Sequence, residues 1–146
     1  MKLIITLLIS LALTGCFVHD VQHYSVIDSS NKTVTVSPGS EGLNGKLKQA
    51  LATAGWSLSV YKGPSISEGE VKNKLKVEQY DTFHTRYRLI ANSNQFDLCL
   101  NFSPAIAYDV SFIDNKSGSE VFTMSGRGCQ PGVVEKFVEA INKTSK

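Results

Sequence analysis

Apolar residues recur at helical spacing in one part of this chain and at the spacing of β-strands in the segments on either side of it. The helical stripe consists of Leu43, Leu47, Ala50, Leu51 and Ala54. Ser40 is a plausible N-cap for this helix, and Gly55 is the expected stop. The β-branched run 33–36 precedes the helix and the alternating run 57–61 follows it. The pattern therefore predicts a β-α-β unit.

The second half of the chain has the period of β-strands. The predicted strands cover residues 86–91, 98–102, 106–112 and 120–125. A polar turn at 92–95 separates the first two strands, and residues 114–118 supply hairpin-turn chemistry between the last two. Residues 126–128 are expected to end the last strand. This half is predicted to be an antiparallel meander.

Two further segments complete the expected fold. Residues 62–82 contain structure breakers and dense charge, and they are predicted to form a loop with strand character near 75–77. A final helix should start near Pro131 and fray at 144–146, and its apolar stripe is Val134, Phe137, Val138 and Ile141. The predicted class is α+β, with two helices packed on one face of a mostly antiparallel sheet.

The first sixteen residues determine the expected compartment. Lys2 provides a positive start, and an apolar run follows from Leu3 to Leu13. This run is shorter than the roughly 20 residues of a membrane-spanning helix and is typical of a secretory signal. The segment Leu13-Thr14-Gly15-Cys16 resembles the lipobox of bacterial lipoproteins. The alternative is an ordinary signal peptide with a cysteine in that place by chance.

The lipobox resemblance implies that residues 1–15 are removed and that Cys16 carries the lipid. Mature proteins of this kind carry three acyl chains, which makes anchoring stable. Phe17 stands where an Asp favours retention in the inner membrane, so the resemblance implies an outer-membrane protein on the periplasmic face. Residues 16–32 are polar and irregular and are predicted to be a lipidated tether, although Tyr24, Val26 and Ile27 also fit an edge strand. Residues 33–146 are then one periplasmic domain.

The charge of the chain bears on whether it binds nucleic acid. The chain has 15 Lys and Arg against 13 Asp and Glu, a formal net charge of +2. Neither this balance nor any run of like charges indicates binding to nucleic acid.

The expected compartment in turn predicts the state of the cysteines. With Cys16 acylated, Cys99 and Cys129 remain, and an even pair in an oxidising compartment indicates a disulfide. Such a bridge closes a loop of about 30 residues and contributes roughly 3 kcal/mol. The alternatives are two free buried thiols or half of a metal site.

Candidate chemistry is sparse. His19 and His23 have the i, i+4 spacing that could share a metal on a helix, but they lie in the predicted tether with no third ligand nearby. No nucleophile elbow surrounds Ser103 or Ser125, and the glycines around Arg127 do not form a phosphate-binding pattern. We therefore expect no catalytic residues, no metal and no cofactor.

Aromatic and arginine side chains gather before and within the first strand of the meander. The candidate partner-contact residues are Tyr80, Phe83, Arg86, Tyr87 and Arg88. Arg together with aromatic residues is the composition of protein-contact hot spots. The competing interpretation is a sheet in which the Tyr and Phe side chains are half buried.

The residues also resemble a group of envelope proteins. The helix end at 51–56, the segment 86–89 and the hairpin at 108–121 are similar to the periplasmic α/β domain of the TolB N-terminal, CsgG and LpoB type. The resemblance covers residues 33–141, and the cysteine pair and short chain depart from it. Residues 47–56 also resemble lipoproteins of pilus and secretion systems.

Both resemblances imply a non-catalytic protein that binds other envelope proteins. The expected function is docking or assembly for a secretion, pilus or cell-wall complex, with an outer-membrane lipid anchor. The alternative is an enzyme or small-ligand binder of the periplasm on the same anchor.

Overall fold

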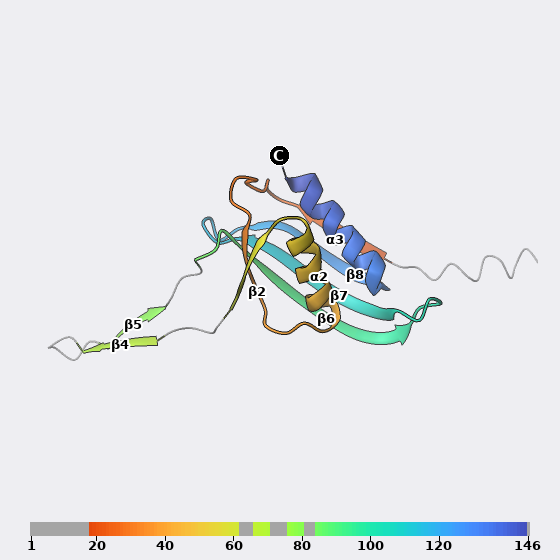
Figure 1. The fold of residues 1–146 in the computed structure, drawn as a ribbon, viewed down its shortest axis with the longest axis horizontal. Coiled ribbons are helices and arrows are strands. Elements are labelled where there is room, and N and C mark those ends of the chain that lie inside the picture. The colour runs from red at the N-terminus through yellow and green to blue at the C-terminus, as the bar shows by residue number, and fades with distance from the viewer. Residues whose placement is uncertain (1–17, 62–65, 71–75, 81–83, 146) are drawn as a thin grey trace, which may run out of the picture.

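The computed structural model describes residues 18–61, 66–70, 76–80 and 84–145, with strands gathered into one large sheet and one small sheet. The large sheet contains β1 (Val18–His23), β2 (Thr33–Val36), β3 (Ser57–Val60), β6 (Tyr87–Leu98), β7 (Pro104–Asp114) and β8 (Glu120–Cys129). Its spatial order is β1-β8-β7-β6-β2-β3. Two helices, α2 (Gly42–Thr53) and α3 (Gln130–Thr144), pack on one face of it (Figure 1). The predicted α+β class is confirmed.

The β-α-β unit forms as the hydrophobic pattern predicts. β2 runs parallel to both β3 and β6, and α2 connects β2 to β3. The helix buries Leu43, Leu47 and Leu51 against the sheet, one residue per turn on the same face. It begins after Glu41, one residue later than the sequence predicts, and Gly55 follows its end with a φ of 79°.

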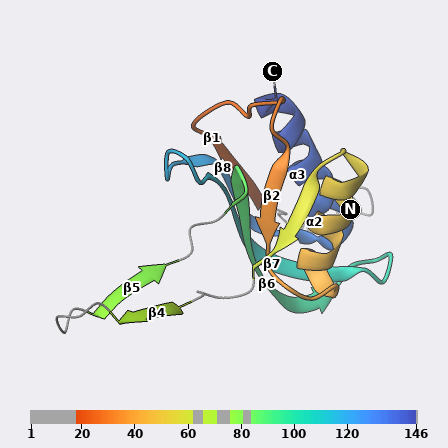
Figure 2. The same cartoon turned by 60° about the vertical axis from the view of Figure 1, so that its left-hand side comes forward.

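The C-terminal helix is longer and more firmly packed than its sequence suggests. Val133, Phe137, Ala140 and Ile141 are buried, whereas Val134 and Val138 of the predicted stripe are half-buried. Thr144, which was expected to fray, is 4% exposed, and its carbonyl accepts a hydrogen bond from Ile27 N at 2.8 Å. Figure 2 shows α3 beside α2 on the same side of the sheet, and the two helices are in contact.

A row of aromatic rings crosses the sheet beneath the helices. Tyr87, Phe112 and Phe122 stack from β6 through β7 to β8, with centroid distances of 5.3 Å between neighbours. Phe137 of α3 continues the row at 5.9 Å from Phe122, and Trp56 meets Phe112 edge to face at 5.4 Å. Phe112, Phe122 and Tyr87 have no exposed surface. This row is the centre of the core.

The predicted tether over residues 16–32 is wrong for the part that the structure describes. β1 pairs antiparallel with β8, from Val18 opposite Arg127 to His23 opposite Phe122. Ile27 is 1% exposed within the core. The sequence does not reveal this strand because two of its three half-buried positions are histidines, which give no apolar signal.

Glycines of β8 make room for β1. Gly126 has a φ of 148°, and a Cβ on it would lie 1.9 Å from the Val18 carbonyl oxygen. These glycines were expected to end the strand, whereas β8 continues through them to Cys129. Gly126 therefore permits the close approach of two backbones.

Two other boundaries differ from the prediction. Residues 92–95, expected to form a turn, belong to β6, and the actual turn to β7 lies at 99–103. The loop expected over residues 62–82 contains β4 (Ile66–Glu70) and β5 (Lys76–Tyr80), which pair as a separate two-stranded sheet. The hairpin turn at 114–118 is confirmed, with the Gly118 N–H donating to the Asp114 carbonyl at 2.8 Å.

Gly126→Ala should detach β1 from β8. The added Cβ meets the Val18 backbone and the backbone angle is unfavourable, so we expect a larger loss of unfolding free energy than for Gly118→Ala. Gly118 also has a positive φ but open space around it, so its variant should cost only the backbone term of about 1–2 kcal/mol. Urea denaturation and hydrogen exchange of the β1 amides measure the difference. Equal losses for the two variants with unchanged β1 protection would contradict this account.

Candidate functional site

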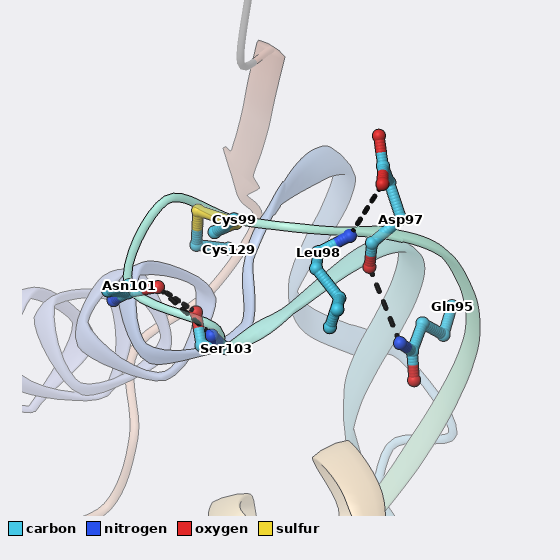
Figure 3. The surroundings of a disulfide bond; sticks show 7 residues. All are labelled: Gln95, Asp97, Leu98, Cys99, Asn101, Ser103 and Cys129. Carbon is cyan, nitrogen blue, oxygen red and sulfur yellow. Dashed lines mark hydrogen bonds between the residues drawn. A yellow bond between two sulfur atoms is a disulfide. The ribbon is translucent and has the colours of Figure 1, made fainter.

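The turn from β6 to β7, residues 99–103, holds a fixed conformation without packing into the core. The Cys99 N–H donates to the Ser103 carbonyl and the Phe102 N–H donates to the Cys99 carbonyl, both at 2.9 Å. The Asn101 side-chain oxygen accepts hydrogen bonds from Ser103 N at 3.1 Å and from Ser103 Oγ at 2.6 Å (Figure 3). Local hydrogen bonds therefore define the shape of this turn.

A disulfide ties this turn to the rest of the domain. Cys99 and Cys129 are bonded with their Cα atoms 6.0 Å apart, so the structure brings together the pair that the sequence pairs. Cys129 is the last residue of β8 and the N-cap of α3. The bridge fixes the turn relative to the start of α3 (Figure 3).

Four large apolar side chains at this end of the β6–β7 hairpin face solvent. We call them the apolar tip: Phe96, Leu98, Leu100 and Phe102. Leu100 is 103% exposed and Phe102 86%, the two highest values among the exposed large apolar residues of the described chain. Phe102 also has a φ of 61°, the one positive φ recorded for a described residue other than glycine. That angle is uncommon for a bulky side chain, and sparsely populated backbone angles concentrate at functional sites.

The sequence pattern did not reveal the apolar tip. The alternation of Leu98, Leu100 and Phe102 indicated a strand, and the polar residues before them indicated the turn. The signal for the true turn was Asn101, whose side chain favours turns, together with Pro104 just beyond it.

The apolar tip lies at the same end of the sheet as the start of β1. Leu98 is opposite Pro104, Ala105 is opposite Cys129, and Arg127 is opposite Val18. The end of β6, the start of β7, the end of β8 and the start of β1 are therefore adjacent. Figure 1 shows the β6–β7 turn projecting beyond the helices at this end.

One polar contact involves the apolar tip, and a second lies at the start of β1. The Arg127 guanidinium lies over the Phe96 ring, 5.6 Å from its centroid. His19 Nδ1 lies 2.7 Å from Tyr108 Oη, with the direction of the hydrogen bond set by the histidine tautomer. Burial, together with the nearby Asp20 carboxylate, raises the pKa of Tyr108 to about 12. The phenol is therefore protonated at neutral pH.

Among the predicted partner-contact residues whose side chains the structure describes, Tyr87 is not at the surface. Tyr87 has no exposed surface, and its hydroxyl accepts a hydrogen bond from Asp28 N at 2.7 Å, so it cannot contact a partner. Arg86 is half-buried and pairs with Asp114 at 2.7 Å, and Arg88 is half-buried as well. Tyr80 is the last residue of β5, and Phe83 lies outside the described residues. The prediction was wrong for Tyr87 because its ring belongs to the core aromatic row.

Metal binding by the histidine pair is excluded by the strand. His19 and His23 lie on β1, where an i, i+4 spacing separates Cα atoms by about 13 Å. No cluster of three or more potential metal ligands occurs in the part of the chain that the structure describes.

The cleft between α2 and α3 is small. It is lined by Leu51, Ala54, Phe137 and Ile141 among others, and offers about 10 Å³ to the centre of a water molecule. That is room for about one water, whereas small-molecule sites measure about 300–1,000 Å³. This cleft does not accommodate a metabolite.

Comparison with known proteins identifies no family. No protein-family model and no curated protein matches the chain. Among solved structures, the PelC dodecamer from Paraburkholderia phytofirmans is similar with a TM-score of 0.49 and 11% identity, over 88% of this chain and 99% of that chain. A point variant of the same dodecamer gives a TM-score of 0.45 and 12% identity, over 87% and 94% of the two chains. Within the described residues, no helix has the length and apolarity needed to cross a membrane.

Removing the disulfide should destabilise the domain. The Cys99→Ser, Cys129→Ser double variant should lose roughly 2–5 kcal/mol of unfolding free energy, since the unfolded chain gains the freedom of a loop of about 30 residues. Urea denaturation measures the loss, and reduced wild-type protein should show the same loss. Counting of thiols on denatured, unreduced wild-type protein should find neither Cys99 nor Cys129 reactive, and two reactive thiols would contradict the bridge.

His23 should make stability depend on pH. Burial and the charge of Lys143 hold its pKa below the ordinary value of 6.5. The unfolded chain therefore binds a proton near pH 6.5, while the folded chain binds it only at lower pH. The unfolding free energy should fall as the pH drops below 6.5 and level off once the folded histidine is protonated too.

Urea denaturation from about pH 7.5 to pH 5 measures this slope. His23→Gln should reduce it, and His84→Gln, at an exposed position, should retain it. A His23→Gln variant with the wild-type slope would rule out this source of pH dependence.

Proposed function

We propose that this chain is a lipid-anchored periplasmic protein of the outer membrane that docks onto, or helps assemble, an envelope complex without catalysing a reaction. The observation that carries the proposal is the lipobox-like segment Leu13-Thr14-Gly15-Cys16, followed after one residue by the chain that forms β1. A lipid on Cys16 would be separated from Val18 by at most about 7 Å of chain. A domain with so short a connection would sit directly on the membrane.

The disulfide supports the compartment in this proposal. Disulfides persist in oxidising environments such as the bacterial periplasm and are rare in the cytosol. The Cys99–Cys129 bridge is therefore in keeping with an exported domain.

The two ends of the large sheet lie at different distances from the proposed anchor. β6 has 12 residues and spans about 35–40 Å. Its last residue, Leu98, lies at the end where β1 begins, and its first, Tyr87, is opposite Asp114 at the other end. We call that second end the distal end. In this proposal it points away from the membrane.

The distal end carries polar groups suited to contact with a partner. Arg86 pairs with Asp114, and the Asn115 N–H donates to the Arg86 carbonyl at 2.9 Å. The exposed residues Lys116 to Ser119 form the turn beyond them. Arg is enriched at protein-contact hot spots, so we place the docking surface here, without Tyr87. A small-ligand binder, the alternative, would need a site other than the cleft between α2 and α3, which is too small for a metabolite.

Cys16→Ser should abolish acylation and docking together. Metabolic labelling with a fatty-acid analogue should mark the wild-type chain and leave the variant unlabelled. Undiminished label in the variant would remove the anchor from the proposal.

Docking is tested in the same cells with a photo-crosslinking residue. Placed at Lys116, on the distal turn, it should join the chain to a defined envelope protein. Placed at Glu135, an exposed position on α3, it should not. The Lys116 product should be lost in the Cys16→Ser background, because an unanchored chain leaves the membrane. Absence of any specific product at Lys116 in the labelled, anchored protein would reject the docking surface.

A further inference from the structure

We propose that the apolar tip enters the interfacial layer of the membrane next to the lipid anchor and so fixes the orientation of the domain. The inference rests on the proposed lipid anchor at Cys16 and extends it. Its occupant is a lipid surface. The proposed function assigns the tip no role.

The side chains of the apolar tip are exposed to water and are not part of the core. Phe96 and Leu98 are 51% and 56% exposed, and Leu100 and Phe102 are more exposed still. Phe96 and Leu98 lie on the last residues of β6, and Leu100 and Phe102 lie on the turn that follows. This turn is closed by its own hydrogen bonds and held by the Cys99–Cys129 bridge. Large exposed apolar side chains gathered at one end of a sheet are typical of an interaction site.

Position favours lipid as the partner. Val18 is opposite Arg127, two residues before the disulfide-bonded Cys129, and only Phe17 lies between Val18 and Cys16. With a reach of about 3.3–3.6 Å per residue, a lipid on Cys16 must enter the membrane beside this end of the sheet. The tip would then already be at the membrane surface.

Composition points the same way. Residues 98–103 include no Asp, Glu, Lys or Arg, so inserting Leu98, Leu100 and Phe102 buries no charge, whereas Phe96 precedes the exposed Asp97 and belongs to the rim. Phe and Leu are side chains with which peripheral segments enter the boundary between headgroups and acyl chains, to a depth of about 5–10 Å. Arg127, exposed and lying over Phe96, would meet lipid phosphates at the rim of the inserted tip.

The test uses the acylated full-length chain in vesicles of phosphatidylethanolamine and phosphatidylglycerol. Phe102→Trp places a fluorophore at the tip, and Tyr61→Trp places one just beyond β3, the strand at the opposite edge of the sheet, as the matched control. The native Trp56 is 5% exposed and serves as the common background in both. Lipids brominated near the headgroup end of their acyl chains quench tryptophans at interfacial depth.

We expect brominated lipid to remove about half or more of the emission added by Phe102→Trp, and little of that added by Tyr61→Trp. Leu100→Trp repeats the tip measurement at a second position, and circular dichroism confirms that each variant is folded. Two outcomes overturn the inference while leaving the anchor intact. One is a vesicle-bound chain whose tip tryptophans are not quenched. The other is a tip tryptophan that is shielded from water, is not quenched by brominated lipid and crosslinks to a second copy of the chain. A chain that carries no acyl label and does not associate with vesicles fails at the anchor and therefore overturns the proposed function.

Discussion

The aromatic row of Tyr87, Phe112, Phe122 and Phe137 is the interaction on which the other parts of this structure depend. It crosses three adjacent strands and ends on α3, so the helix and the meander share one set of contacts. Burial of rings of this size gives large apolar stabilisation, and stacked or tilted pairs add to it. The row also fixes the register of β6, β7 and β8, because a shift of one residue would turn each ring to the opposite face.

The two helices do not cover the whole length of the large sheet. α2 and α3 lie over the middle of the sheet, and the end of β6 projects beyond them (Figure 1). From Asn92 to Leu98 every residue of β6 is exposed. Backbone pairing with β7, local hydrogen bonds of the turn and the disulfide replace core packing there. A projection built in this way keeps its shape while leaving its side chains free for contact.

Elements whose two faces differ in residue type were predictable from the sequence, and those whose two faces carry similar residue types were not. Residues 106–112 alternate because one face meets the helices and the other meets water, and the strand was predicted from that alternation. Residues 92–95 are exposed on both faces, so they have no apolar period and resemble a turn. β1 was missed for a related reason, since its inward positions include His19 and His23, which carry no apolar signal. The disulfide partners were predicted by counting, whereas the exposure of Leu100 and Phe102 required the three-dimensional turn.

The position of β1 links the core to the membrane end of the proposed arrangement. β1 docks along β8 only because Gly126 leaves room for the Val18 backbone, and β8 in turn contributes Phe122 to the aromatic row. The chain from Val18 onward is therefore part of the sheet. In the proposed arrangement, a long flexible tether would leave the domain free to rotate about its lipid, whereas a strand that starts at Val18 leaves one residue between the sheet and Cys16. In such an arrangement an apolar tip held by a disulfide beside the anchor would add a second point of contact, and two points of contact restrict the tilt of the distal end relative to the membrane.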